Sequence, residues 1–265
     1  MKIYISADIE GVAGTTSWSE TDLDEVEYSP FQMQMTAEVK AACLGALDAG
    51  AAEVWIKDAH GTGRNIIQSK LPEKTVLLRG WSGHPYSMMQ ELDSSFDACL
   101  MVGYHAGAGS DQSPLAHTLT SKAVEIKLNG QAMSEFHLNS YTAALQSVPV
   151  VFVSGDRSIC DQAARLIPGI SACAVKWGRG DSTANIHPEL VLERIEEGAR
   201  AALQRDFRQC RIELPDSFLL EIRYKKPFKA YKASFYPGAE AVGADTVRLR
   251  ADNYFDVLRM LTFVL

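Results

Sequence analysis

The chain has 265 residues, 46% hydrophobic and 22% charged, a composition typical of a globular protein long enough to bury a sizeable core in one or two domains. A net charge of −7 without a Lys/Arg stripe argues against binding to nucleic acid or to an anionic membrane. No apolar run has the length of a membrane span and no secretory signal opens the chain, so we expect a cytoplasmic protein.

The first part of the chain alternates strand and helix patterns. In chain order, the residues predict a strand from Lys2 that ends at two carboxylates, a helix over 36–49, and strands over 53–57, 75–78 and 98–102. Gly50 follows the predicted helix, as is common at helix ends. Strands that alternate with helices pair in parallel, so this part predicts a doubly wound sheet.

The pattern changes after residue 110. Val124, Ile126 and Leu128 alternate with polar residues and are followed by Asn129-Gly130, which predicts an antiparallel hairpin. Further on, the residues predict helices over 134–145, 156–167 and from 188, and strands over 150–153, 171–175, 218–224 and 246–250. The last segment is a helix or a strand rich in Leu, Met and Phe.

These elements predict an α/β fold with a doubly wound, mostly parallel Rossmann-like sheet and a second, smaller α+β lobe. We expect the parallel lobe to comprise residues 1–110 and 139–183. The smaller lobe would comprise residues 111–138 and 184–265.

The cysteines are five in number, scattered, and without a CxxC pair. We expect buried free thiols in a reducing compartment, not a thiolate metal site. The residues are Cys43, Cys99, Cys160, Cys173 and Cys210.

Metal-ligand residue types follow three of the predicted strands. Asp8 and Glu10 end the first strand and point to the same side of an extended chain. Asp58 and His60 end the second strand, and His105 follows the strand over 98–102. In an open parallel sheet, ligands bind beyond the carboxyl ends of the strands, so these groups would share one edge.

The five groups are nitrogen and oxygen ligands, which suit Zn²⁺, Mn²⁺ or Co²⁺. Two like charges such as Asp8 and Glu10 repel unless a proton or a cation lies between them. Read alone, that pair could equally be two solvated turn residues. Together, the three strand ends predict a metal site, and a carboxylate flanked by others is what a two-metal site requires.

Other motifs carry weaker signals. Asp58 would either orient His60 or cap a turn. The glycine-rich segments 11–14 and 105–110 resemble phosphate loops, but neither has the G-x-G-x-x-G pattern, and no P-loop lysine follows, so we expect no nucleotide cofactor. Residues 176–180 could bind a substrate carboxylate, although a solvated turn is the simpler interpretation.

The sequence resembles the zinc-dependent D-aminopeptidase family in motifs that run in order from Met1 to about Lys176. No single motif is specific, but the set is. The matching residues are Ser6-Ala7-Asp8-Ile9-Glu10-Gly11-Val12-Ala13-Gly14, Asp58-Ala59-His60, Gly103-Tyr104-His105-Ala106, Ala116-His117-Thr118, Glu135, Leu138-Asn139, Val148-Pro149-Val150, Gly155-Asp156, Ile167-Pro168 and Ala174-Val175-Lys176.

The resemblance implies a peptidase that holds two Zn²⁺ ions per chain, with Mn²⁺ or Co²⁺ as alternatives. Asp8 would bridge the two ions. Glu10 and His105 would complete one site, and His60 and Glu135 would complete the other.

The resemblance also implies that His117 is the catalytic residue, acting as nucleophile or general base. Members of the family remove N-terminal D-residues, notably D-alanine, from short peptides and assemble into a ring-shaped decamer. The chain departs from the family beside the ligand Glu135, where Phe136 and His137 would line or crowd the site.

Two alternatives remain open at this point. The chain could be a different two-metal hydrolase on the same scaffold, acting on an amide or a phosphoester. It could also be a nucleotide- or metabolite-binding module without hydrolysis that uses the glycine-rich loops on its Rossmann-like sheet. Metal analysis separates these classes, because only the hydrolases require about two ions per chain.

Overall fold

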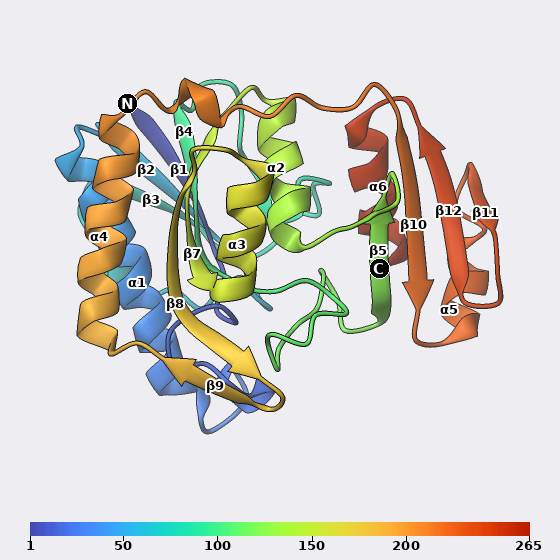
Figure 1. The fold of residues 1–265 in the computed structure, drawn as a ribbon, viewed down its shortest axis with the longest axis horizontal. Coiled ribbons are helices and arrows are strands. Elements are labelled where there is room, and N and C mark those ends of the chain that lie inside the picture. The colour runs from blue at the N-terminus through green and yellow to red at the C-terminus, as the bar shows by residue number, and fades with distance from the viewer.

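A large sheet built around β1 (Lys2–Ala7) confirms the predicted doubly wound α/β fold in the computed structural model, which describes residues 1–265 (Figure 1). The strand order is β3-β2-β1-β4-β7-β8-β9, and every pair is parallel except β8 with β9. Its first six strands therefore follow the Rossmann order. The bounds of the other strands are β2 (Glu53–Asp58), β3 (Thr75–Leu78), β4 (Ala98–Tyr104), β7 (Val150–Asp156), β8 (Ser171–Arg179) and β9 (Ser182–Asn185).

Helices cover both faces of this sheet, as the fully buried residues of β4 require (Figure 1). Helices α1 (Tyr28–Asp48) and α4 (Pro188–Gln204) pack together on one face, and α2 (Glu135–Leu145) and α3 (Arg157–Leu166) lie on the other. The pair α1 and α4 is in close contact, because a Cβ atom on Gly45 would lie only 2.2 Å from the carbonyl oxygen of Glu196.

A second, antiparallel sheet forms the small lobe, with strand order β11-β12-β10-β5-β6. Its bounds are β5 (Ala123–Leu128), β6 (Gln131–Ala132), β10 (Phe218–Tyr224), β11 (Ala239–Ala241) and β12 (Thr246–Ala251). Helices α5 (Pro227–Ala233) and α6 (Tyr254–Val264) cover one face. The hairpin of β5 and β6 turns at Asn129 and Gly130, which both have positive φ angles, as a type I′ turn requires.

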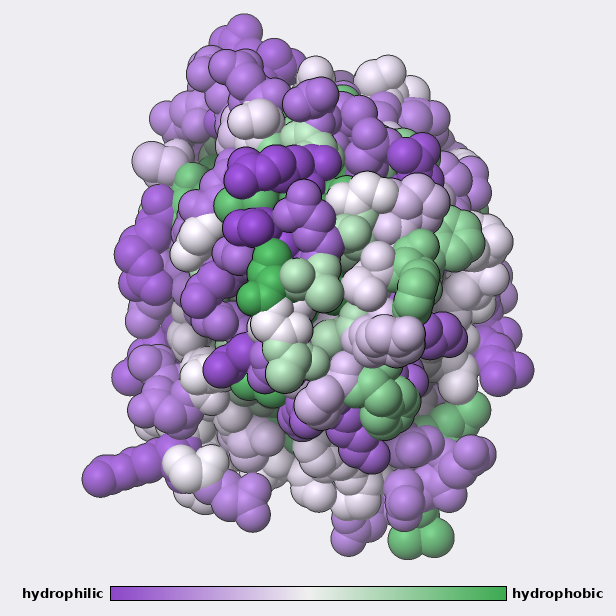
Figure 2. Space-filling view, turned by 90° about the vertical axis from the view of Figure 1, so that its right-hand side faces the viewer, coloured by the Kyte–Doolittle hydropathy of each residue, from purple (hydrophilic) through white to green (hydrophobic).

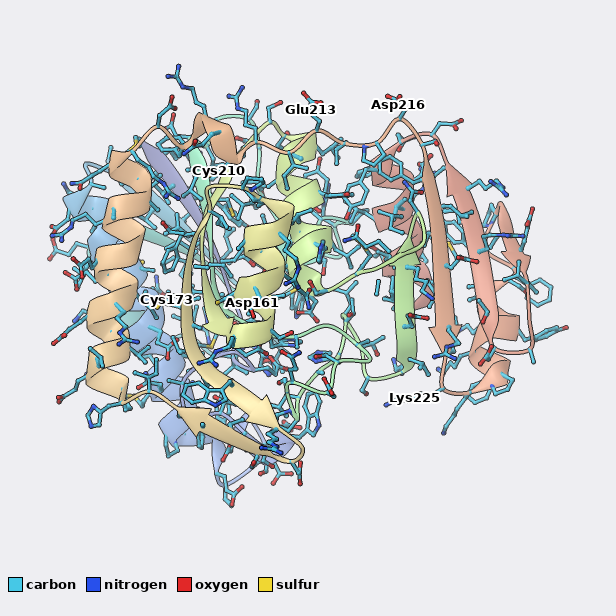
Figure 3. All side chains as sticks on the ribbon, viewed as in Figure 1. Asp161, Cys173, Cys210, Glu213, Asp216 and Lys225 are labelled. Carbon is cyan, nitrogen blue, oxygen red and sulfur yellow. The ribbon has the colours of Figure 1, made fainter.

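The chain crosses from the large lobe to the small lobe through the irregular segment 211–217. Figure 3 shows Glu213 and Asp216 along this crossing, after Cys210 and before β10. Both acidic side chains are exposed, so the crossing runs over the surface. All five cysteines are free, and all but Cys173 are buried.

The predicted division between the lobes is wrong at α4. We had assigned residues 184–265 to the small lobe, whereas Val191, Ile195 and Ala199 of α4 belong to the core of the large sheet. The sequence pattern identified the apolar face of α4 but could not tell which sheet that face covers. Helix α1 also begins earlier than predicted, and the sequence patterns did not predict β9, α5 and β11. None of the helices combines the length and the apolar character needed to cross a membrane.

Candidate metal centre and active site

The candidate metal centre lies where strands β1, β2 and β4 end side by side. Ala7 of β1 pairs with Asp58 of β2 and Val102 of β4, so the residues that follow leave the sheet at the same level. Between β1 and β4 the chain order reverses, and crevices form at such points. The prediction that these strand ends meet at one edge is therefore confirmed.

Two glycines allow these strand ends to come close to each other. Gly103 has a φ of +73°, and a Cβ atom there would lie 2.2 Å from the carbonyl oxygen of Asp8. A Cβ atom on Gly11 would lie 1.8 Å from the carbonyl oxygen of Tyr104. Larger residues at either position would push the segment carrying Asp8 away from β4.

Asp8 lies between two histidines and directs one carboxylate oxygen toward each. Its Oδ1 is 3.3 Å from Nδ1 of His60, and its Oδ2 is 3.5 Å from Nε2 of His105. Glu10 Oε2 is 2.9 Å from the same His60 nitrogen, and Glu135 Oε2 is 3.3 Å from the same His105 nitrogen. Three groups of these side chains could hold a metal ion: the triads Asp8-Glu10-His60 and Asp8-His105-Glu135 share Asp8, and Glu10-His105-His117 is the third.

The structure brings together all five residues predicted as metal ligands, but it divides them differently from the expectation. The family resemblance groups Glu10 with His105 and His60 with Glu135. The closest contacts place His60 beside Glu10 and His105 beside Glu135, although Glu10 and His105 also lie together in a group with His117. Sequence could not resolve this division, because it depends on which way each side chain turns after its strand.

Backbone carbonyls fix the orientation of the His60 and His105 rings. Nε2 of His60 lies 2.8 Å from the carbonyl oxygen of Thr21, and Nδ1 of His105 lies 2.9 Å from that of Ala106. Each of these nitrogens carries a proton and donates it to the carbonyl. The other ring nitrogen of each histidine faces the carboxylates, as in metal sites whose histidines are oriented by a second hydrogen bond.

Burial and close charges shift the pKa values of these groups strongly. Burial, reinforced by the charge of Glu10, raises the pKa of Asp8. Burial alone would raise the pKa of Glu10, but the imidazoles of His60, His105 and His117 hold it well below its usual range. Burial alone would lower the pKa of His60 and of His105, yet the adjacent carboxylates raise both well above the usual value. The cluster thus attracts positive charge.

His117 approaches the same carboxylates from the loop between β4 and β5. Its Nε2 lies 3.5 Å from Glu135 and 3.9 Å from Glu10, and its Nδ1 lies 2.9 Å from the carbonyl oxygen of Leu115. The imidazole stacks on that of His105, with ring centroids 4.4 Å apart. The rings of Trp18 and His117 meet edge to face, with centroids 5.2 Å apart. His117 therefore presents a ring nitrogen to the centre without belonging to either of the triads that share Asp8.

The donor set fits a metal ion such as Zn²⁺. Nε2 of His105 and Oε2 of Glu10 are buried without a hydrogen-bond partner, although buried polar atoms are normally paired. Both atoms point into the carboxylate and imidazole cluster. Imidazole and carboxylate ligands without cysteine, with an open side, are typical of catalytic zinc sites.

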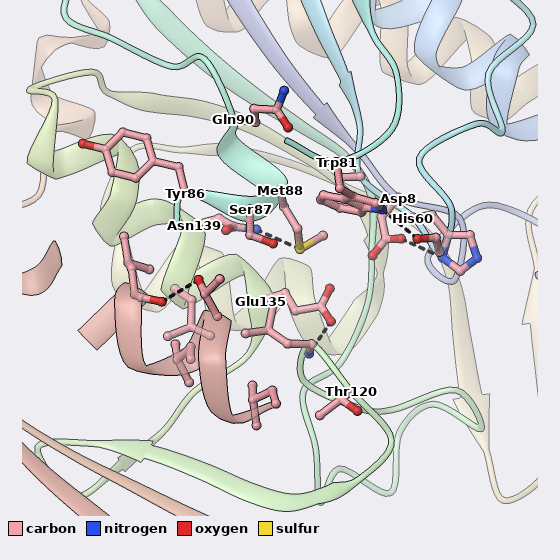
Figure 4. Close-up of a pocket in the computed structure, with 18 of the residues that line it drawn as sticks. Asp8, His60, Trp81, Tyr86, Ser87, Met88, Gln90, Thr120, Glu135 and Asn139 are labelled. Atoms are coloured by element: carbon pink, nitrogen blue, oxygen red, sulfur yellow. Dashed lines mark hydrogen bonds and ion pairs between the residues drawn. The ribbon is translucent and has the colours of Figure 1, made fainter. Parts of the chain in front are cut away.

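A cavity of about 550 Å³ opens from the centre into the space between the lobes. Figure 4 shows Asp8 and His60 at one side of the cavity, Tyr86 at the other and Glu135 between them. The far wall is apolar and includes Leu258 and Leu261 of α6. The centre can therefore act on a substrate that extends several atoms beyond it.

Phe136 and His137 do not line this cavity, contrary to the expectation. Phe136 is fully buried in the core of the large lobe. His137 turns back to Ser134, whose Oγ lies 3.0 Å from its Nδ1. Successive helix residues point about 100° apart, so with Glu135 facing the centre its two successors face away.

Two further predicted residues also take structural roles. Asp58 accepts hydrogen bonds from the backbone N–H groups of Asn65 and Ile66, at 2.6 and 2.7 Å. Of the two roles expected for it, Asp58 therefore caps a turn. Lys176 is buried and donates to the backbone carbonyls of Glu10 and Thr15, so it is neither solvated nor free for a substrate. These two hydrogen bonds hold the segment that carries Glu10 in place.

The contacts of Thr21 and Trp18 were missed by sequence reasoning. Thr21 acts through its backbone carbonyl, which every residue has, so no sequence signal could reveal it. Trp18 lies half-exposed in a polar segment, where an aromatic residue is a weak signal of a site.

Comparison with known proteins gives consistent results. The family model described as D-aminopeptidase matches residues 1–263. A D-aminopeptidase of Bacillus subtilis is 29% identical over 263 residues, covering 98% of this chain and 95% of the relative. The solved structure of the Zn-dependent D-aminopeptidase DppA from Bacillus subtilis, described as a self-compartmentalizing protease, superposes with a TM-score of 0.93 at 28% identity, over 98% of this chain and 95% of that one.

Proposed function

The chain belongs to the D-aminopeptidase family, and from this premise we propose that it is a zinc-dependent aminopeptidase that releases N-terminal D-residues, such as D-alanine, from short peptides. The observation that carries the proposal is the pair of triads sharing Asp8 at the bottom of a cavity large enough for a short peptide. The negative charge of the protein argues against nucleic acid as a substrate.

The proposal assigns two zinc ions to each chain, with Mn²⁺ or Co²⁺ as alternatives. Asp8, Glu10 and His60 would hold one ion, and Asp8, His105 and Glu135 would hold the other. The direction of the two Asp8 oxygens toward different histidines supports its assignment as the bridging ligand. Bound zinc would act as a Lewis acid that polarises the scissile carbonyl group.

His117 is the proposed catalytic residue. Because its Nδ1–H donates to the carbonyl oxygen of Leu115, its Nε2 is free to take a proton from the attacking water and return it to the leaving amine. The carboxylates of Glu10 and Glu135 would stabilise the imidazolium that forms. The same lone pair could attack the carbonyl carbon directly, so the nucleophile role is the alternative.

We further propose a homo-oligomer, in the form of the ring-shaped decamer expected from the family resemblance. Helix α5, the residues just after it and α6 carry four exposed aromatic side chains, which we call the exposed aromatic face of the small lobe, and Figure 2 shows apolar side chains gathered on this side of the molecule. Large exposed apolar patches are rare on monomers and mark interfaces. The residues of the aromatic face are Phe228, Tyr231, Phe235 and Phe263. The free cysteines support a reducing, cytoplasmic location.

A peptide screen tests the proposed function. The purified protein is stripped of metal, reloaded with zinc, and offered matched pairs of short peptides that differ only in the chirality of the first residue. We expect release of N-terminal D-residues, dependence on zinc, and little turnover of the L-peptides. Hydrolysis of phosphoesters but not of peptides would contradict the proposal, as would turnover that persists in the metal-free protein.

A further inference from the structure

Asn139 lines the cavity one helical turn after Glu135 and has no role in the metal triads. The two residues are four positions apart on α2, so they lie on the same face of the helix. The side chain of Asn139 is nearly buried, with 4% of its surface exposed. Its amide nitrogen donates to the hydroxyl of Tyr104 at 2.9 Å and contacts the sulfur of Met88 at 3.3 Å (Figure 4).

A chain of hydrogen bonds fixes which way the Asn139 amide points. The hydroxyl of Ser6 donates to the carbonyl oxygen of Met88 at 2.9 Å, so its single proton is used. The hydroxyl of Tyr104, 2.7 Å from that of Ser6, must therefore donate to Ser6 and accept from Asn139. The amide nitrogen of Asn139 is thus held toward Tyr104, and the carbonyl oxygen Oδ1 is held away from it.

Oδ1 of Asn139 is consequently an oriented acceptor without a protein donor. An asparagine oxygen can accept two hydrogen bonds, and Asn139 lies on the cavity wall, so a ligand in the cavity can donate to it. No Lys or Arg lines the cavity. The wall away from the metal centre therefore offers neither of these side chains to the carboxyl end of a peptide, whereas Oδ1 of Asn139 offers an acceptor to an amino group.

We propose that Oδ1 of Asn139 binds the free amino group of the substrate's N-terminal residue. This proposal rests on the proposed aminopeptidase function. Ser6 and Tyr104 act as positioning residues, because they set the orientation of the amide without touching the substrate. The interaction selects peptides with an unblocked amino terminus.

The test compares Asn139→Leu, which removes the acceptor at similar volume, with Ser140→Ala, a buried change on the same helix that does not line the cavity. For the zinc-loaded proteins we would measure kcat and KM on a D-alanyl dipeptide. Calorimetry would give the dissociation constants of D-alanine and N-acetyl-D-alanine. Zinc content and circular dichroism verify folding, and Asn139→Ala replaces the leucine variant if that variant does not fold.

We expect Asn139→Leu to raise KM and the dissociation constant of D-alanine about 5- to 100-fold, the effect of leaving one buried group without its partner. Its kcat and its affinity for N-acetyl-D-alanine should stay within about threefold of the wild type, as should every parameter of Ser140→Ala. Unchanged D-alanine affinity in the leucine variant, or equal losses for both ligands, would overturn the proposal. If the wild type hydrolyses no peptide, the proposed function fails while the two binding constants still decide the role of Asn139.

Discussion

The carboxyl edge of the large sheet and the C-terminal part of the small lobe bury different kinds of side chain. Every buried polar or charged residue lies between Ser6 and Lys176, and residues 177–265 bury hydrophobic side chains alone. Burying charge costs free energy unless the charge is paired or binds a metal, so the cluster of buried Asp8, Glu10 and His105 at this edge marks where the fold is maintained for chemistry. The C-terminal part instead supplies an apolar cavity wall and the exposed aromatic face.

Asp8→Ala would test this contrast most severely, because one side chain serves both triads. We expect loss of metal at both positions and a fall in kcat/KM of about 10³-fold or more, since a catalytic metal contributes several kcal/mol. Metal content by mass spectrometry and peptide turnover are the measurements. Retention of full metal content in a folded variant would show that Asp8 is not the shared ligand.

His117→Ala should separate catalysis from metal binding at the same edge. We expect the zinc content to be unchanged and kcat to fall about 10²- to 10⁴-fold, the usual contribution of a general base. Turnover on D-peptides and zinc analysis of the same preparation are the readouts. Loss of zinc together with activity would identify His117 as a ligand. Near-normal turnover would show that the role of His117 is structural.

Changes to the exposed aromatic face should disrupt the assembly and leave the zinc content unchanged. The double variant Phe235→Asp and Phe263→Asp places two charges on side chains that are 70% and 73% exposed, so the fold should tolerate it. We expect the assembly to dissociate toward the mass of one chain, 29.1 kDa, by light scattering, with zinc content retained. Gln68→Asp, a surface change on the large lobe, is the matched control. A monomeric wild type would refute the assembly itself.

Glu38 offers a smaller test of the cost of burying charge in the large lobe. Burial raises the pKa of Glu38 to about 7, although hydrogen bonds from Gln34 and the backbone of Ala13 lower it in part. The unfolded chain loses this proton near its ordinary value of 4.5, so between pH 4.5 and 7 the folded state binds more protons. The free energy of unfolding should therefore fall as the pH rises through this window.

Glu38→Gln should remove that fall, which amounts to roughly 1–3 kcal/mol in the wild type. Urea unfolding at the two ends of the window measures it. Glu193→Gln, on an exposed position of α4, should retain the wild-type pH dependence. The same pH dependence in Glu38→Gln as in the wild type would contradict the buried-carboxyl account.

The sequence predicted which residues gather at the carboxyl edge of the large sheet better than it predicted how those residues pair. The strand ends carrying Asp8, His60 and His105 followed from periodicity and from the rule that ligands gather at one edge of a parallel sheet. Glu135 and His117 lie outside those strand ends, so only the family resemblance pointed to them. The pairing of ligands required side-chain directions that a sequence does not contain.

Other errors have similarly local causes. Lys176 is the kind of residue that sequence places at the surface, and only packing reveals that it is buried against the carbonyl of Glu10. The short elements α5 and β11 have seven and three residues, too few for periodicity to be recognised. Helix α4 was predicted but assigned to the wrong lobe, because an amphipathic pattern does not show which sheet the apolar face covers.

In the proposed two-zinc centre, five strand-end and helix-start residues hold the ions and His117 is not a ligand. Anomalous diffraction at the zinc absorption edge from zinc-loaded crystals tests it most directly. The account predicts two peaks per chain about 3.5–4 Å apart, one beside Glu10 and His60, the other beside His105 and Glu135, with Asp8 between them. A single peak, or a zinc ion within about 2.1 Å of His117 Nε2, would contradict it.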